Sequence, residues 1–231
     1  MVNLDENAKK TILGVLAIGL GMFVYFKYFK KTTQSISKNG VLFVGDSITA
    51  IEYNNTPIKT NYPYLIKQEL EPKGIKVDVL AVGGKGTKWM LDNLILKLKT
   101  NKYDRIYIYG GVNDMFSAVT EKSALDNIQS MVNVANQNGS DAFVITGYDT
   151  KDFMDEDKLK TTSYVPTKAG MVALKNRYIS FQNAIPKTIK NATIVEKFDI
   201  PSSMTSDAIH PSAKGQKIIA EILLKDLLKN I

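Results

Sequence analysis

The sequence has 231 residues, a net charge of +7, no cysteine and a single histidine, His210. Without cysteine there can be no disulfide, thiolate metal site or cysteine nucleophile, and one histidine excludes a metal site built from several imidazoles. Residues 1–38 hold six lysines against two acidic residues, so more than half of the excess charge lies there and fits membrane flanks better than a nucleic-acid surface. We therefore expect no nucleic-acid partner.

The first predicted element is an N-terminal hydrophobic helix. Residues 11–26 carry no charge, and apolar character resumes at Tyr28 and Phe29. At 1.5 Å per residue the uncharged run spans about 24 Å, which reaches across a membrane if the flanking lysines extend to the interface. A buried core helix fits less well, because apolar residues surround the whole helix. We expect residues 1–31 to form a single-pass anchor that contacts lipid through residues 11–29.

Two features of this segment bear on its processing and orientation. A signal peptide would need a small-residue cleavage site after the apolar run, but Lys-Tyr-Phe-Lys-Lys follows it, which favours an uncleaved signal-anchor. Lysines are denser after the helix than before it, which points to the cytoplasmic side, whereas an exported signal-anchor protein would have the opposite bias. The side of the membrane is therefore left open. Residues 32–39 are polar and predict a linker.

From Gly40 onward, short apolar runs alternate with longer stretches of helical periodicity. The expected strands are residues 41–44, 77–82, 105–109, 142–146 and 193–195. The expected helices are residues 62–70, 87–98, 123–136, 170–183 and 212–228. This order predicts one domain, residues 40–231, with a five-stranded parallel sheet between two layers of helices. Ligands of such folds bind beyond the carboxyl ends of the strands.

The first strand leads directly into Gly45-Asp46-Ser47. A serine on the turn from a strand into a helix is exposed at the edge of the sheet, beside backbone N–H groups, and this position suits a nucleophile. The simpler interpretation is that Asp46 or Ser47 caps the helix.

The second strand is followed by Gly83-Gly84-Lys85-Gly86-Thr87. Glycines allow backbone amides to approach a ligand closely, as in an oxyanion hole or a phosphate cradle. The loop matches neither of the common glycine-rich nucleotide motifs, so nucleotide binding is disfavoured.

The third strand ends in Gly111-Val112-Asn113-Asp114, where the amide of Asn113 can donate to a developing oxyanion, although Asn-Asp is also common in turns. Asp207 and His210 precede the last predicted helix, and their spacing lets the carboxylate reach one imidazole nitrogen while the other faces a serine. A lone histidine in a loop is otherwise an ordinary surface residue.

Together the four motifs resemble the conserved blocks of the SGNH (GDSL-like) family of serine esterases and lipases, over about residues 40–231. The resemblance implies a flavodoxin-like three-layer α/β/α fold with no metal and no cofactor. It implies the triad Ser47, Asp207 and His210, and an oxyanion hole made by the amide of Ser47, a glycine and Asn113. The second block lacks the asparagine that usually precedes its glycine, and we expect Gly84 to be the donor, with Gly86 as second choice.

The expected activity is therefore hydrolysis of a carboxylic ester by a membrane-tethered enzyme. O-acetylated glycans, short-chain esters and lysophospholipids all remain open as substrates. Residues 148–168 are long, polar and charged, which predicts either a lid or a surface excursion. The alternatives are a catalytically idle carbohydrate-binding or structural module of a membrane-associated or viral assembly, and a phosphate-binding domain that uses the Gly83–Thr87 loop.

Overall fold

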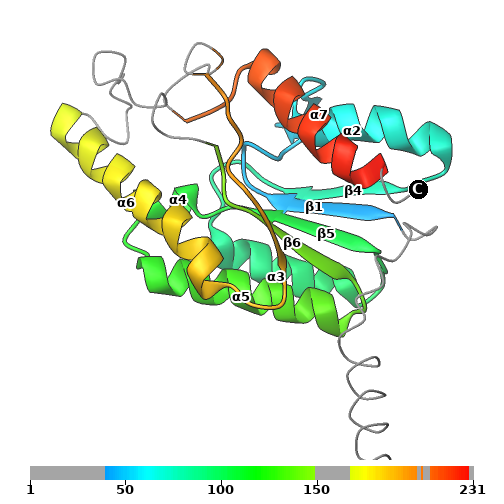
Figure 1. The fold of residues 1–231 in the computed structure, drawn as a ribbon, viewed down its shortest axis with the longest axis horizontal. Helices are drawn as coiled ribbons and strands as arrows, with labels where there is room; N and C mark the ends of the chain where they lie inside the picture. The colour runs from blue at the N-terminus through cyan, green and yellow to red at the C-terminus, as the bar shows by residue number, and fades with distance from the viewer. Residues whose placement is uncertain (1–39, 149–166, 202–203, 205–208, 229–231) are drawn as a thin grey trace, which may run out of the picture. The chain divides into compact units, whose positions relative to one another are not determined.

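The computed structural model describes residues 40–148, 167–201, 204 and 209–228 (Figure 1). The predicted anchor and linker, most of the predicted lid segment, and Asp207 lie outside these residues. None of the described helices is long and apolar enough to cross a membrane.

A parallel five-stranded sheet forms the centre of the fold, as the sequence predicted. Its strands lie in the order β4-β1-β5-β6-β7, and every neighbouring pair is parallel. Their bounds are β1 Val41–Gly45, β4 Val77–Ala81, β5 Arg105–Tyr109, β6 Asp141–Ile145 and β7 Thr193–Val195. The end of β1 pairs with the ends of β4 and β5, so the segments that follow these three strands begin at one edge of the sheet.

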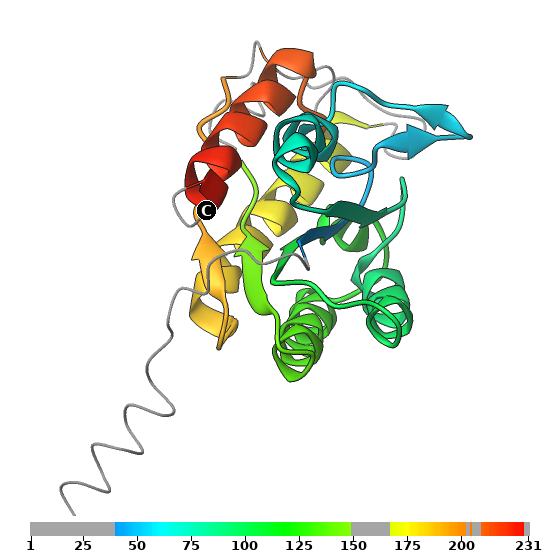
Figure 2. The same cartoon turned by 90° about the vertical axis from the view of Figure 1, so that its right-hand side faces the viewer.

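Helices cover both faces of the sheet (Figures 1 and 2). Their bounds are α2 Tyr62–Leu70, α3 Thr87–Leu98, α4 Val112–Phe116, α5 Glu121–Gln137, α6 Lys168–Thr188 and α7 Ala213–Leu228. A short 3₁₀ helix, η1 (Glu71–Lys73), follows α2. The predicted helices correspond to all of these except α4 and η1, which are too short to show a helical period.

Alternate residues of β1 divide between two hydrophobic cores. Leu42 and Val44 pack in the core that holds the apolar sides of α3, α5 and α6. Val41 and Phe43 pack in the core on the other face, under α2 and α7. Strands buried on both faces read as continuous apolar runs, which is why they were recognisable in the sequence.

A small hairpin, β2 (Glu52–Tyr53) with β3 (Thr56–Pro57), follows the first strand and extends away from the main sheet (Figure 2). This hairpin was not predicted from the sequence. Its strands are two residues long and exposed, so they carry no apolar alternation. The turn between them places Asn54 and Asn55 at positive φ, which asparagine tolerates better than most residues.

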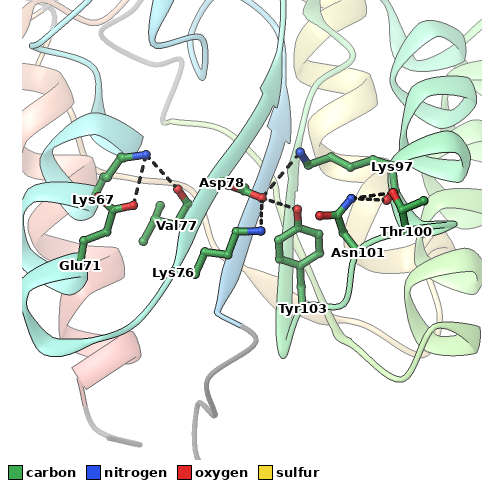
Figure 3. Close-up of polar contacts among 9 residues, drawn as sticks. All are labelled: Lys67, Glu71, Lys76, Val77, Asp78, Lys97, Thr100, Asn101 and Tyr103. Carbon is green, nitrogen blue, oxygen red and sulfur yellow. Dashed lines mark hydrogen bonds and ion pairs between the residues drawn. The ribbon is translucent and has the colours of Figure 1, made fainter.

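The edge strand β4 is protected by charged side chains (Figure 3). Asp78 of this strand accepts hydrogen bonds from Tyr103 and Lys76, with Lys97 at 3.6 Å. Burial alone would raise the pKa of Asp78, but hydrogen bonds from Lys76 and Tyr103 lower it below its ordinary value. Lys67 donates to the carbonyl of Val77 on the same strand. Charges of this kind block pairing of the edge with another chain.

Candidate active site

The turn after β1 presents Ser47 at the carboxyl edge of the sheet. The backbone N–H of Ile48 donates to the Asp46 carboxylate at 3.0 Å, and those of Thr49 and Ala50 donate to the Asp46 carbonyl. The helix that the sequence predicted directly after Ser47 is not formed: residues 47–49 make a single turn, and α2 begins only at Tyr62. The Asp46 carboxylate caps this turn, and the Ser47 hydroxyl is left for another partner. Gly45 is required here because a Cβ would overlap Thr49 and lie 2.7 Å from the carbonyl oxygen of Tyr109.

Side chains from two helices hold the serine turn in place. The amide of Asn61, at the start of α2, donates to the carbonyls of Ala50 at 2.7 Å and Ser47 at 3.3 Å. Gln216 on α7 donates to the carbonyl of Ile48 at 3.1 Å and accepts from the backbone N–H of Tyr62 at 3.0 Å. Gln216 is buried, so these bonds fix the turn against α7, the helix that follows His210.

His210 lies next to Ser47 in the fold, although the two residues are far apart in the sequence. Its Nε2 lies 2.8 Å from the Oγ of Ser47, although 163 positions separate the two residues in the sequence. Both side chains are half-buried. At this distance an imidazole nitrogen can accept the serine proton. The structure therefore brings together two of the three predicted triad residues, and Asp207, the third, lies outside the described part of the chain.

The loop between β4 and α3 lies beside Ser47. A Cβ placed on Gly83 would be 3.7 Å from the Cβ of Ser47, whereas one on Gly84 would have nothing within 4 Å. The backbone N–H groups of Lys85 and Thr87 are bonded within the protein, but those of Gly83, Gly84 and Gly86 make no hydrogen bond to another described residue. Amides without protein partners at a glycine-rich turn can donate to a ligand.

Asn113, in the first turn of α4, is held next to this loop. One N–H of its side-chain amide donates to the carbonyl of Lys85 at 3.1 Å. An asparagine amide has two N–H groups, so this bond orients the side chain and leaves the second donor for another acceptor. Gly111, which precedes α4, has φ +108°, and a Cβ there would overlap the ring of Phe181.

A buried carboxylate joins the two loops. Asp114 accepts from the backbone N–H of Thr87 at 2.9 Å and from its hydroxyl at 2.7 Å. The amide of Asn127 donates to the same hydroxyl at 3.1 Å. A Cβ on Gly86 would lie 3.1 Å from the Asp114 carboxylate, so the glycine permits this close approach. Asp114 therefore fixes the glycine loop relative to Asn113.

Sequence reasoning did not single out Asn61, Gln216, Thr87 or Asn127. Each acts through its side chain on a segment that is remote in sequence, and no local pattern marks such a contact. The Asp114 position could be noticed only because it follows Asn113 in a motif.

Burial raises the pKa of Asp46, the residue that precedes Ser47. Asp46 is 1% exposed, and this burial raises the pKa of its carboxyl from 3.8 to about 6. The N–H of Ile48 and the charge of His210 lower the pKa, while the Asp114 carboxylate raises it. The described residues include no group of three or more His, Asp or Glu side chains that could hold a metal ion.

Several solved structures share this fold. A psychrotrophic esterase, EstA from Pseudoalteromonas sp., is 16% identical with a TM-score of 0.55, and the match covers 83% of this chain and 97% of that one. The acetylxylan esterase Axe2 from Geobacillus stearothermophilus is 18% identical with a TM-score of 0.57, covering 81% and 93%. The acetyl xylan esterase AlAXEase is 15% identical with a TM-score of 0.53, covering 81% and 98%.

Among curated proteins, no sequence matches this chain. The model of the GDSL-like Lipase/Acylhydrolase family, in contrast, matches residues 43–218. This range contains the serine turn, the glycine loop, Asn113 and His210, and it covers well over half of the chain. The chain therefore belongs to the GDSL-like lipase/acylhydrolase family and is a hydrolase that acts on ester bonds.

Proposed function

We propose that this protein is a serine esterase whose nucleophile is Ser47 and whose general base is His210. The observation that carries the proposal is the 2.8 Å contact between Ser47 Oγ and His210 Nε2 at the carboxyl edge of the sheet. His210 is the only histidine of the chain, so no other residue can serve as an imidazole base. Asp207, three residues earlier, is proposed to bind the other ring nitrogen and stabilise the imidazolium.

The reaction follows from this arrangement. His210 Nε2 accepts the proton of Ser47 as Oγ attacks the ester carbonyl and forms the tetrahedral intermediate. The intermediate collapses as the bond to the leaving oxygen breaks, and His210 returns the proton to that oxygen, which releases the alcohol. Water then attacks the acyl-enzyme with the same proton transfers and releases the acid.

The oxyanion is proposed to be stabilised by three N–H donors. They are the backbone amide of Ser47, an amide of the glycine loop and the second N–H of the Asn113 side chain. The hydrogen bond from Asn113 to the Lys85 carbonyl supports this role, because it orients the amide before substrate arrives. Gly84 remains our preferred glycine donor, with Gly86 as second choice, and the position of Gly83 beside Ser47 adds a third candidate.

Small acyl groups are the proposed substrates, with O-acetylated glycans as the favoured class. Two of the structurally similar proteins are acetylxylan esterases, which supports acetyl esters over the other classes. Longer acyl chains, as in lysophospholipids, remain the alternative. A series of p-nitrophenyl esters from acetate to laurate tests this directly. We expect the highest kcat/KM with acetate, and a rate that rises steadily with chain length would contradict the acetyl preference.

The same assay tests the catalytic residues. Ser47→Ala and His210→Ala should each lower kcat by at least about 10³-fold while leaving the folded structure intact. Ser130→Ala is the matched control, because this half-buried serine of α5 donates to the carbonyl of Asp126 in its own helix and lies outside the proposed site. Wild-type turnover in Ser47→Ala would exclude the proposed nucleophile. Absence of turnover in the wild type itself would favour the idle-module alternative.

We also propose that residues 11–29 tether the enzyme to a membrane. The uncharged run between Lys10 and Lys27 supports this proposal. Liposome flotation of the full chain and of residues 40–231 is the test. The full chain should float with the vesicles and the shorter chain should stay in the aqueous fraction. Equal partitioning of the two would rule the tether out.

A further inference from the structure

Among the described residues, two hydrogen bonds flank His210, one on each side of it. On its C-terminal side, the backbone N–H of Ser212 donates to the carbonyl of Met204 at 2.7 Å. On its N-terminal side, the hydroxyl of Tyr148 donates to the carbonyl of Ile209. That carbonyl belongs to the peptide bond between Ile209 and His210. A donor held at this oxygen restrains the orientation of the Ile209–His210 peptide group, and with it the backbone position of His210.

Tyr148 is itself rigidly placed. It follows β6, and its backbone forms a parallel bridge with Phe198. The N–H of Phe198 donates to the carbonyl of Gly147 at 2.9 Å, and the amide of Gln182 donates to the carbonyl of Tyr148 at 3.3 Å. The Tyr148 side chain is 1% exposed. A buried tyrosine has only two rotatable side-chain bonds, so its hydroxyl is held in one position relative to the sheet.

We propose that Tyr148 is a positioning residue for the reaction, which sets the imidazole of His210 at hydrogen-bond distance from Ser47. The inference rests on the proposed function, since it concerns the base assigned there. Ser47 is fixed by the turn after β1, whereas His210 lies in a loop ahead of α7. The distance between Oγ and Nε2 therefore depends on how firmly that loop is attached to the sheet. An error of about 1 Å in such a distance can cost about a hundredfold in rate.

The direct test is Tyr148→Phe in the full chain, which removes one hydroxyl and keeps the ring. We expect kcat to fall about tenfold, as for the loss of one well-formed hydrogen bond, with KM changed less than twofold. A purely structural role would lower the melting temperature and leave kcat at 25 °C unchanged.

Tyr107→Phe is the matched control. Tyr107 is also 1% exposed, and its hydroxyl bonds Asp226 at 3.2 Å. Asp226 lies 13 positions beyond Ala213, so about 20 Å along α7 separates it from the end of the helix that follows His210. The control should match Tyr148→Phe in any loss of stability but keep wild-type kcat. An equal fall in kcat for both variants would overturn the proposal.

A spectroscopic readout reports on the histidine itself. Because the chain has one histidine, ¹⁵N-histidine labelling of the untagged protein gives a single imidazole spin system. We expect Tyr148→Phe to shift or split its signals and to displace the pH midpoint of the histidine titration, with no such change in Tyr107→Phe. Identical imidazole spectra and pH–kcat profiles for Tyr148→Phe and wild type would overturn the proposal.

The two levels of inference fail in different ways. If Ser47→Ala and His210→Ala abolish turnover but Tyr148→Phe retains full kcat, only the positioning role is overturned. If Ser47→Ala retains turnover, the proposed nucleophile is wrong, and the role of Tyr148 falls with it.

Discussion

The carboxyl group of Asp46 makes the stability of this protein depend on pH in an unusual direction. Most native carboxylates have lowered pKa values and stabilise the fold as pH rises. Asp46 is buried beside the nucleophile, and burial raises the pKa of its carboxyl to about 6 from 3.8. Asp46→Asn keeps an oxygen that can accept from the N–H of Ile48 and removes the charge. The substitution therefore isolates the electrostatic cost of the acid.

The sign and size of the effect follow from the two pKa values. Between pH values of about 4 and 6 the folded protein keeps the proton on Asp46, while the unfolded chain releases it. The free energy of unfolding therefore falls as pH rises through this range, and above about pH 6 the loss is complete. A difference of about two pKa units corresponds to about 3 kcal/mol. As pH rises from about 4 to 7.5, the free energy of unfolding of Asp46→Asn should therefore increase by that amount relative to wild type.

Urea denaturation of both proteins at the two pH values measures this difference, and any cost of the asparagine that does not depend on pH cancels. Asp78→Asn is the control, because hydrogen bonds from Lys76 and Tyr103 lower the pKa of Asp78 despite its partial burial. That carboxylate stabilises the fold above its unfolded pKa of 3.8, and the contribution is lost only as pH falls below that value. The stability difference between Asp78→Asn and wild type should therefore change little between the two pH values. If the stability difference between Asp46→Asn and wild type were the same at both pH values, the reasoning about Asp46 would be refuted.

Three other substitutions test the surroundings of the site. Asn113→Ala should lower kcat by about 10²-fold to 10³-fold with little change in KM, as measured with p-nitrophenyl acetate; an unchanged kcat would remove Asn113 from the oxyanion hole. Gly111→Ala should destabilise the protein by about 2 kcal/mol or more in urea titrations, because φ is +108° and the methyl group would overlap Phe181; wild-type stability would contradict this packing. Thr87→Val removes a donor from buried Asp114 and should cost about 1–3 kcal/mol together with part of kcat, whereas a neutral result in both assays would show that the loop is held by other contacts.

Two control variants sharpen these tests. Asn93→Ala removes an amide of the same kind from α3, where it bonds only the carbonyl of Trp89, and should leave kcat unchanged. Gly84→Ala places a methyl group at φ +76° where nothing lies within 4 Å. It should lower the free energy of unfolding by about 1–2 kcal/mol, because only the unfavourable positive φ contributes. The excess cost of Gly111→Ala over Gly84→Ala then measures the overlap with Phe181.

The three central strands of the main sheet, β1, β5 and β6, could be predicted because they are buried on both faces. In β1, all five residues from Val41 to Gly45 are buried, so the apolar run is continuous and ends at the glycine of the turn. The bounds of α2 and α3 were predicted correctly, whereas α5, α6 and α7 were predicted with shifted ends. α5 begins at Glu121 rather than at residue 123, because the hydroxyl of Thr120 accepts from the N–H of Ser123 and caps it. The hairpin β2–β3 and α4 were missed because a few residues cannot show a period.

The site could be predicted only in part. Ser47 and Asn113 lie in recognisable motifs at strand ends. His210 could be named as the candidate base because the chain has no other histidine. The glycine was harder to choose, because the sequence cannot tell which of three nearby amides would meet a substrate. A Cβ on Gly83 would lie 3.7 Å from the Cβ of Ser47, and the choice of Gly84 as donor stays a prediction.

The supporting residues were not predictable. Gln216 reaches Ile48 from 168 positions away, and Tyr148 reaches Ile209 from 61 positions away. Such contacts depend on how the segments pack together, and each side chain taken alone looks like an ordinary core or helix residue. Only the folded structure shows that Gln216 lies beside the serine turn and Tyr148 beside the loop that carries His210.

Labelling of the full chain with a fluorophosphonate, followed by peptide mapping, tests the central claim most directly. A phosphonate on a serine mimics the tetrahedral intermediate, and the similar esterase EstA was solved as a complex inhibited by monoethylphosphonate. The account predicts one label per chain, located on Ser47 and absent from both Ser47→Ala and His210→Ala. Absence of labelling in the wild type, or a label on another residue, would contradict it.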